Sequence, residues 1–169
     1  MNNISIETER KFLILIPSCE DMKNQKQFRE RKIIQTYLKR TDNKNARVRE
    51  ITENGKISYI KTVKERISIL SCFEEEEEIS KEEYNQLLEK ADKEKKRINK
   101  TRFSFEYSNH ILEIDVYEFW NDRATLEIEL KSEDESFSIP SFIKVIKEIS
   151  ADARYKNTNL AKSIPFDEI

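Results

Sequence analysis

Charged side chains recur at every second position along several short segments of this chain, with apolar residues between them. Glu127 and Glu129, for example, alternate with Leu126, Ile128 and Leu130. Residues two apart lie on one face of a β-strand, so such a segment has a charged face and an apolar face. A helix would instead need apolar residues three and four positions apart. The pattern therefore predicts a chain built mainly of antiparallel strands.

Turn residues mark where these strands end. Asn54-Gly55 separates two strand-like segments and is the strongest short signal for a β-hairpin. The polar triplets at residues 108–110 and 120–122 supply further turns. The expected strands cover residues 4–14, 46–52, 56–64, 70–79, 100–107, 111–117 and 124–131.

Helical segments are fewer. Ser80 and Glu83 form a capping box at the start of one expected helix. A second helix is expected over residues 18–28. Pro140 is expected to open a third helix, because apolar residues follow it at helical spacing up to position 149. The predicted fold class is α+β, dominated by antiparallel strands.

The composition excludes several kinds of site. The chain has 31 Lys and Arg against 33 Asp and Glu, a net charge of −2, so its bulk charge does not indicate a nucleic-acid binder. It has one glycine, which excludes a glycine-rich phosphate loop or a dinucleotide-binding motif. One histidine and two cysteines exclude His-rich zinc sites and paired Cys-x-x-Cys clusters.

The length of 169 residues predicts a single domain over residues 1–169. The polar and acidic first residues are unlike a signal peptide, and no segment approaches the roughly 18 apolar residues that span a membrane. Cys19 and Cys72 are consistent with reduced thiols. We therefore predict a cytoplasmic protein without a membrane partner, with a homodimer as the default assembly.

The like-charged pairs need a physical reason. A solvated sheet face is one interpretation, but such a face gains nothing from like charges two residues apart. Carboxylate pairs suit a divalent cation held between them, and Lys and Arg pairs suit a polyanion. A closed barrel could place these charges in a polar bore and turn the apolar faces outward under helices. The residues alone leave both interpretations open.

The order of the charged motifs resembles one known family. Glu7-Thr8-Glu9-Arg10-Lys11 resembles the N-terminal ExExK signature of the CYTH superfamily, whose members are also called triphosphate tunnel metalloenzymes. Residues 152–161 look like the family's C-terminal segment, so the resemblance runs from Ile6 to about Ala161. The motifs between these ends are Arg47-Val48-Arg49, Thr62-Val63-Lys64, Glu74-Glu75-Glu76, Lys100-Thr101-Arg102-Phe103, Glu113-Ile114-Asp115 and Glu127-Ile128-Glu129-Leu130.

The resemblance implies an eight-stranded antiparallel β-barrel with helices packed outside, whose tunnel holds a linear triphosphate and Mg²⁺ or Mn²⁺. It implies that the metal-side carboxylates are Glu7, Glu9, Glu113, Asp115, Glu127 and Glu129. It implies that the phosphate contacts are Lys11, Arg47, Arg49, Lys64, Lys100, Arg102 and Arg154. Glu74 and Glu76 would face the tunnel and act with Lys11 in catalysis, by serving a second metal or by positioning water.

Two positions depart from the family pattern or leave it ambiguous. Members often carry arginine just before the acidic motif of residues 70–79, where this chain has Cys72, so one cationic contact is expected to be missing. Lys61 and Lys64 are three residues apart and lie on opposite faces of a strand, so only one can point inward. The family's Thr-x-Lys pattern favours Lys64.

The resemblance predicts a metal-dependent triphosphatase that hydrolyses the terminal phosphate of inorganic tripolyphosphate or another triphosphate. An adenylate cyclase that makes cyclic AMP from ATP needs similar charges and is the first alternative. A non-catalytic module that binds polyphosphate or a nucleotide is the second, and Cys72 is the feature that hints at it. The expected partner is a small triphosphate-containing molecule and not a nucleic acid.

Overall fold

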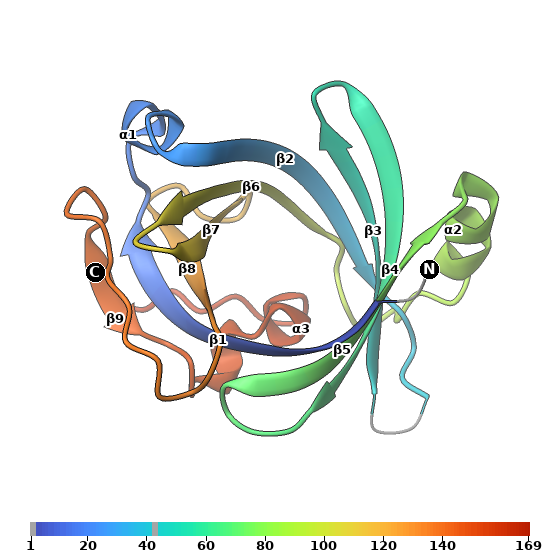
Figure 1. The fold of residues 1–169 in the computed structure, drawn as a ribbon. Coiled ribbons are helices and arrows are strands. Elements are labelled where there is room, and N and C mark those ends of the chain that lie inside the picture. The colour runs from blue at the N-terminus through green and yellow to red at the C-terminus, as the bar shows by residue number, and fades with distance from the viewer. Residues whose placement is uncertain (1–2, 42–43) are drawn as a thin grey trace.

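The computed structural model describes residues 3–41 and 44–169. Its strands curve around one axis and close into an eight-stranded antiparallel barrel (Figure 1). The order around the barrel is β5-β4-β3-β2-β6-β7-β8-β1, and β1 returns to β5. This confirms the barrel implied by the family resemblance. The strands are β1 (Asn3–Leu15), β2 (Lys26–Tyr37), β3 (Asn45–Glu53), β4 (Lys56–Arg66), β5 (Ser71–Ile79), β6 (Ile98–Tyr107), β7 (His110–Tyr117) and β8 (Arg123–Leu130).

Strand β1 closes the barrel because it pairs with a different strand along each half. Its first half pairs with β5 as far as Thr8, and its second half pairs with β8 from Thr8 to Leu15. Beyond Thr8 the edge that faced β5 is paired instead with a short ninth strand, β9 (Val145–Glu148). Backbone donors and acceptors along a strand edge need partners, and β9 supplies them outside the barrel.

The predicted strands are confirmed, with boundaries that differ by at most two residues. Two of the connecting turns have positive φ at both central residues. These values are 49° and 77° at Asn54 and Gly55, and 48° and 63° at Ser108 and Asn109. Two-residue loops with this geometry match the twist of the strands they join, so the sequence signals for both hairpins are confirmed.

The predicted helix over residues 18–28 was wrong beyond residue 23. A helix was expected to run to residue 28, but α1 (Cys19–Lys23) is short and Ser18 makes no side-chain cap. The chain then enters β2, a strand that was not predicted. Because β2 pairs with both β3 and β6, its backbone bonds on two sides outweigh the weak local preference for a helix.

The other two expected helices had different outcomes. The helix capped by Ser80 is confirmed as α2 (Lys81–Leu88), where the Ser80 Oγ accepts a hydrogen bond from the Glu83 N–H at 3.1 Å. The helix after Pro140 was wrong, because the unpaired edge of β1 draws Val145–Glu148 into β9. No helix in the described part of the chain is long and apolar enough to cross a membrane.

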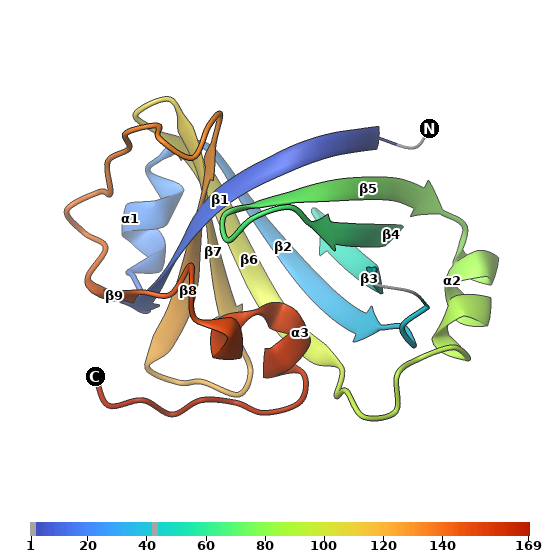
Figure 2. The ribbon, with the colours of Figure 1, turned by 90° about the horizontal axis from the view of Figure 1, so that it is seen from below.

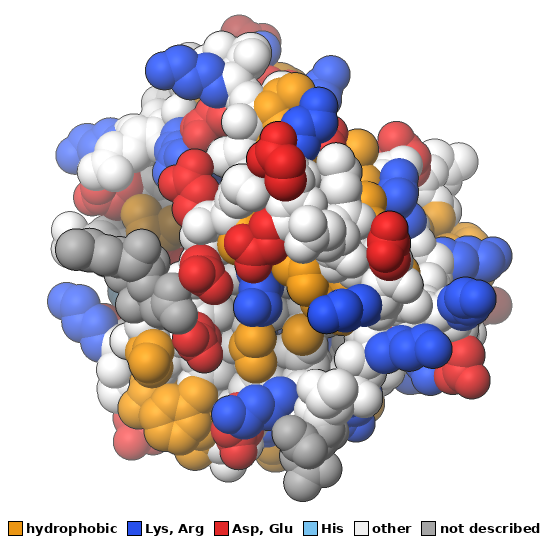
Figure 3. All heavy atoms as spheres, turned by 90° about the vertical axis from the view of Figure 1, so that its right-hand side faces the viewer, with side chains coloured by type: hydrophobic (Ala, Val, Ile, Leu, Met, Phe, Trp, Pro, Cys, Tyr) orange, Lys and Arg blue, Asp and Glu red, His pale blue; other side chains and the backbone are white. Residues whose placement is uncertain are grey.

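The apolar strand faces point outward, as expected, but helices supply only part of their cover. Leu126 and Ile128 on β8 have no exposed surface. They belong to a cluster with Met22 of α1 and Ile143 of the loop before β9. Tyr84 of α2 packs in a second cluster over β3 and β4. Around α2 the outer surface mixes acidic and basic side chains (Figure 3), as a solvated surface does.

One end of the barrel is closed by aromatic and aliphatic side chains. Tyr37 and Tyr117 pack there against the short helices η1 (Ala153–Tyr155) and α3 (Asn157–Leu160). Trp120 lies in the same cluster and packs over this end of the barrel. Figure 2 shows α3 and the C-terminal tail at the lower end of the barrel, far from the start of β1.

Two matched substitutions test which strand faces form the core. Ile128→Ala removes a side chain with no exposed surface and is expected to lower the free energy of unfolding by about 2–5 kcal/mol. Ile57→Ala truncates a side chain that is 56% exposed and is expected to change it by less than about 0.5 kcal/mol. Urea unfolding measures both, and equal effects would contradict the assignment of faces.

Candidate functional site

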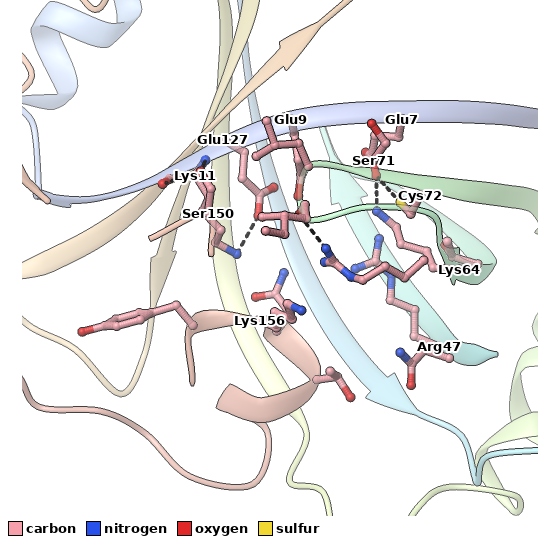
Figure 4. Close-up of a pocket in the computed structure, with 18 of the residues that line it drawn as sticks. Glu7, Glu9, Lys11, Arg47, Lys64, Ser71, Cys72, Glu127, Ser150 and Lys156 are labelled. Carbon is pink, nitrogen blue, oxygen red and sulfur yellow. Dashed lines mark hydrogen bonds and ion pairs between the residues drawn. The ribbon is translucent and has the colours of Figure 1, made fainter. Parts of the chain in front are cut away.

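The alternating charged residues meet inside the barrel. Pairing places Arg102 opposite Asp115, Glu113 opposite Glu127, and Lys11 opposite Glu127. Residues directly opposite one another point to the same face of a sheet, so these charges share the bore. A cavity of about 330 Å³ lies within it (Figure 4). The solvated-sheet interpretation is therefore wrong for these strands.

The cavity brings together part of the predicted site. The predicted site residues that line it are Glu7, Glu9, Lys11, Arg47, Lys64, Arg102 and Glu127. Lys64 forms an ion pair with Glu7 inside the barrel, whereas Lys61 lies 3.9 Å from Glu77 and does not line the cavity. The ambiguity between the two lysines is thus resolved in favour of Lys64.

Arg102 on β6 is the centre of the first wall of the site. Its guanidinium pairs with Asp115 at 2.7 Å, with Glu127 at 3.0 Å and with Glu113. Lys11 approaches the other oxygen of Glu127 at 2.7 Å. Burial by itself would raise the pKa of Glu127, but Lys11 and Arg102 outweigh it and lower the pKa to about 2. Glu127 is therefore an ionised carboxylate held in a fixed position.

Lys100 and Asp115 lie behind this wall rather than on it. Their side chains are each 1% exposed and approach to 2.6 Å, and neither lines the cavity. Burial lowers the pKa of Lys100 to about 7, in spite of the neighbouring Asp115. Burial alone would raise the pKa of Asp115, but Arg102 and Lys100 hold it well below its usual range. The structure thus places both residues where they support Arg102.

The second wall comes from β3, β4 and β5. Lys64 bridges two carboxylates, Glu7 on β1 and Glu74 on β5, the latter at 2.6 Å. Burial would lower the pKa of Lys64, yet Glu7 and Glu74 together raise it. Beside them Arg49 donates to Glu76 at 2.6 Å. Glu74 and Glu76 therefore orient the cations of this wall, and neither lines the cavity.

Glu9 stands between the two walls. Among the described residues, no hydrogen bond or ion pair to its carboxylate is formed. Burial, together with Glu127 and Glu7, raises the pKa of Glu9 to about 8. Glu129 lies opposite Glu9 on β8 and is exposed. Its pKa is also raised, by partial burial and by Glu113 and Glu7. On this side of the bore the protein thus supplies no cationic partner among the described residues, and without one the ionised form of Glu9 is disfavoured at neutral pH.

The opposite side carries cations that are only partly paired. The Arg47 Nη1 donates a long hydrogen bond to the Gln35 Oε1 at 3.3 Å, and its buried Nε has no partner among the described residues. Lys156, just before α3, faces the same cavity. Burial and the nearby Arg66 lower the pKa of Lys156. Figure 4 shows Arg47 and Lys156 across the cavity from Glu7 and Glu9.

Cys72 lines the cavity next to Glu7, with its Sγ 3.5 Å from the Glu7 Oε2. Burial, together with Glu7, raises the pKa of its thiol to about 11. Both cysteines are free, as the sequence predicted. At the position where the family often carries arginine, this chain therefore has a neutral group.

Arg154 is a predicted site residue that lies on the outside of the molecule, away from the cavity. Its side chain is 56% exposed and pairs with Asp152 at 2.6 Å and with Asp167 at 2.9 Å. These two carboxylates hold the guanidinium over the outer side of the C-terminal segment, away from the cavity lining. The expectation that Arg154 reaches the phosphate is corrected accordingly.

Several residues of the bore lie outside the predicted site. Arg31, Gln35 and Tyr37 lie on β2, where Arg29 and Arg31 form a like-charged pair of the kind seen on the other strands. Arg31 binds Glu113 at 3.0 Å and so completes the first wall. Lys156 stands two residues after Arg154, and only the path of the chain through η1 shows that it faces inward.

Comparisons with known proteins agree with this geometry. The CYTH domain family model matches residues 5–163. The crystal structure of the inorganic triphosphatase NE1496 has 28% sequence identity and a TM-score of 0.59, covering 95% of this chain and 97% of that one. No curated protein matches the chain.

Two further solved structures share the fold. The PH1819 protein from Pyrococcus horikoshii has 19% identity and a TM-score of 0.56, covering 76% of this chain and 81% of its own. A candidate adenylate cyclase from Bacillus halodurans has 18% identity and a TM-score of 0.53, covering 77% and 83%. With the family match over nearly the whole chain, the closed barrel and its charged bore identify this protein as a member of the CYTH domain family.

Proposed function

We propose that this protein is a divalent-metal-dependent triphosphatase that hydrolyses the terminal phosphate of inorganic tripolyphosphate or another triphosphate. The observation that carries the proposal is the division of charge in one cavity. Among the described residues, no cation pairs with Glu9 in the cavity lining or with Glu129 opposite it on β8, and on the other side Arg47 and Lys156 lack full partners. A metal–triphosphate complex has the complementary charges. The similarity to an inorganic triphosphatase supports the same assignment.

The donor set fits a hard divalent cation, which prefers carboxylate oxygens. Among the described residues, no three His, Cys, Asp or Glu side chains are gathered as a finished metal cage. The reason is that Glu7 and Glu127 turn toward Lys64, Lys11 and Arg102. Glu9 and Glu129 have no such partner. We propose that Glu7, Glu9, Glu127 and Glu129 would hold the cation, whether Mg²⁺ or Mn²⁺.

Phosphoryl transfer needs mainly positioning and neutralisation of charge. Lys11, Lys64 and Arg102 are fixed by the carboxylates they bind, so they are oriented before the substrate arrives. Arg47 has donor capacity left for phosphate oxygens. Held by Glu7, Glu9, Glu127 and Glu129, a divalent cation would supply neutralisation of phosphate charge and a lower pKa for bound water. Glu74 and Glu76 position Lys64 and Arg49, and their predicted role in positioning water stays a prediction.

The same charges suit an adenylate cyclase or a binding module, so a panel of assays separates these functions. Phosphate release from tripolyphosphate, ATP and thiamine triphosphate is measured with Mg²⁺ and with Mn²⁺, and cyclic AMP is measured in parallel. We expect metal-dependent phosphate release without cyclic AMP. Formation of cyclic AMP, or binding without turnover with either metal, would contradict the proposed activity. The cytoplasmic location and the homodimer stay sequence-based predictions.

Glu9→Gln tests the uncompensated carboxylate. It is expected to lower metal-dependent phosphate release at least about 100-fold, because a metal ligand is lost. It should leave the protein as stable as before or more so, because a buried unpaired acid is costly. Glu129→Gln is expected to act in the same direction. The control is Glu77→Gln, on the outer face of β5. Its activity is expected to stay within about twofold of that of the wild-type protein. Full activity of Glu9→Gln would contradict the metal assignment.

Lys64→Ala and Lys61→Ala form a matched pair on one strand. Lys64 lines the cavity, so its loss is expected to raise the KM for tripolyphosphate about tenfold or more. Lys61 lies outside the bore, and its loss is expected to leave KM and kcat unchanged. Steady-state kinetics checks both variants. An equal effect of the two substitutions would show that the cavity is not the substrate site.

A further inference from the structure

Asp167, in the C-terminal tail, gathers an unusual number of contacts. Its carboxylate accepts from the Lys147 Nζ at 2.5 Å, from the Arg154 Nη1 at 2.9 Å and from the Tyr155 hydroxyl at 2.8 Å. These hydrogen bonds hold the pKa of Asp167 well below its usual range. One side chain thus ties β9 and η1 to the tail.

The backbone of the tail is anchored as well. The Trp120 Nε1 donates to the carbonyl of Pro165 at 3.2 Å, and the Arg123 guanidinium donates to the carbonyl of Asp167. Trp120 also belongs to the cluster that closes this end of the barrel. Figure 2 shows the tail running along the lower end of the barrel, below α3. The tail therefore follows a defined path.

The segment held by Asp167 is a wall of the cavity. Tyr155 has no exposed surface, and the next residues, Lys156, Asn157 and Thr158, line the cavity. On the inner side, the Tyr117 hydroxyl donates to the Asn157 Oδ1 at 2.6 Å. Asp167 supplies the matching tie on the outer side. The wall is thus fixed from both sides.

The contacts of Asp167 oppose an electrostatic repulsion at the cavity. Lys156 lies near Arg66 at the cavity, and no ion pair to a carboxylate is formed by Lys156 among the described residues. Like charges repel each other, so Arg66 disfavours the inward position of Lys156. A wall without an outer clamp would move outward and take Lys156 from the position where an anion can use it.

We propose that Asp167 is a positioning residue that clamps the η1–α3 segment so that Lys156 and Asn157 face the bound anion. Arg154 belongs to this clamp and acts through Asp167 rather than by touching phosphate. The inference rests on the proposed function in one respect, which is that the anion is a triphosphate. The segment held by the clamp contacts the substrate both in the bound ground state and in the transition state. Loss of the clamp is therefore expected to weaken substrate binding more than it slows the chemical step.

The test measures the affinity for tripolyphosphate by calorimetry in the presence of EDTA, where metal-dependent turnover is prevented. Asp167→Asn and Arg154→Ala are each expected to weaken binding about tenfold, since each removes charged hydrogen bonds from the clamp. The double variant is expected to bind no more weakly than either single variant, because both changes break one unit. Asp167→Glu is expected to recover part of the affinity. Glu168→Gln, next to the clamp in the tail, is the control with unchanged affinity.

Trp120 is the single tryptophan of the chain, so its emission reports the tail independently of substrate. We expect Asp167→Asn to shift this emission and Glu168→Gln to leave it as it is. Lys147→Ala removes one of the three groups on Asp167 and is a milder variant, expected to weaken binding by less than Asp167→Asn. If Asp167→Asn does not fold, the affinity of Lys147→Ala for tripolyphosphate tests the clamp instead.

Two results would overturn the clamp. One is wild-type affinity in both Asp167→Asn and Lys147→Ala. The other is a double variant whose losses multiply, since Arg154 would then contact the anion itself. Failure of the proposed function is distinguishable. A wild-type protein that binds tripolyphosphate but releases no phosphate with metal contradicts the triphosphatase, while the clamp is still judged by the affinities. A wild-type protein that binds tripolyphosphate neither in EDTA nor with Mn²⁺ contradicts both.

Discussion

Neutralisation of charge across the bore is the interaction on which the rest of this structure depends. A row of buried like charges on one strand would be too costly without opposite charges facing it. Arg102 meets this need for three carboxylates on β7 and β8, and Lys64 does so for Glu7 and Glu74. A slip of one residue in the register of any strand would turn its charges into the apolar cover. The charge pairs therefore help to define the strand alignment as well as the site.

Neutralisation is incomplete where the cavity lies, and this makes the site chemically useful. Among the described residues, Glu9 and Glu129 on one side have no cationic partner, and Arg47 and Lys156 on the other side are only partly paired. Residues behind the cavity, such as Lys100 and Asp115, are fully paired and buried. The contrast separates supporting residues from those that can bind a ligand. Binding of a metal and a polyanion together would complete the pairing.

Most of the barrel could be predicted from sequence because strand periodicity and hairpin turns are local signals. Strand β2 could not be predicted in this way. The local signals at residues 18–28 favoured a helix, whereas the pairing of β2 with β3 and β6 depends on distant residues. The faces of the charged residues were predictable, but their depth was not. Alternation alone does not distinguish Lys100, 1% exposed, from Arg102 on the cavity wall. Arg154 was misplaced because Asp167 lies 13 residues away and follows no regular pattern.

The C-terminal segment shows how a barrel with a polar interior can adapt one opening. Its helices are too short to be stable alone, and contacts with Tyr117 on one side and Asp167 on the other hold them.

The central claim is that the cavity binds a cation on its carboxylate side and a triphosphate on its basic side. The most direct measurement is a crystal structure with tripolyphosphate and Mn²⁺. We expect Mn²⁺ against Glu9 and Glu129 and phosphates against Arg47, Lys64 and Lys156, whereas a ligand bound outside the bore would contradict this claim.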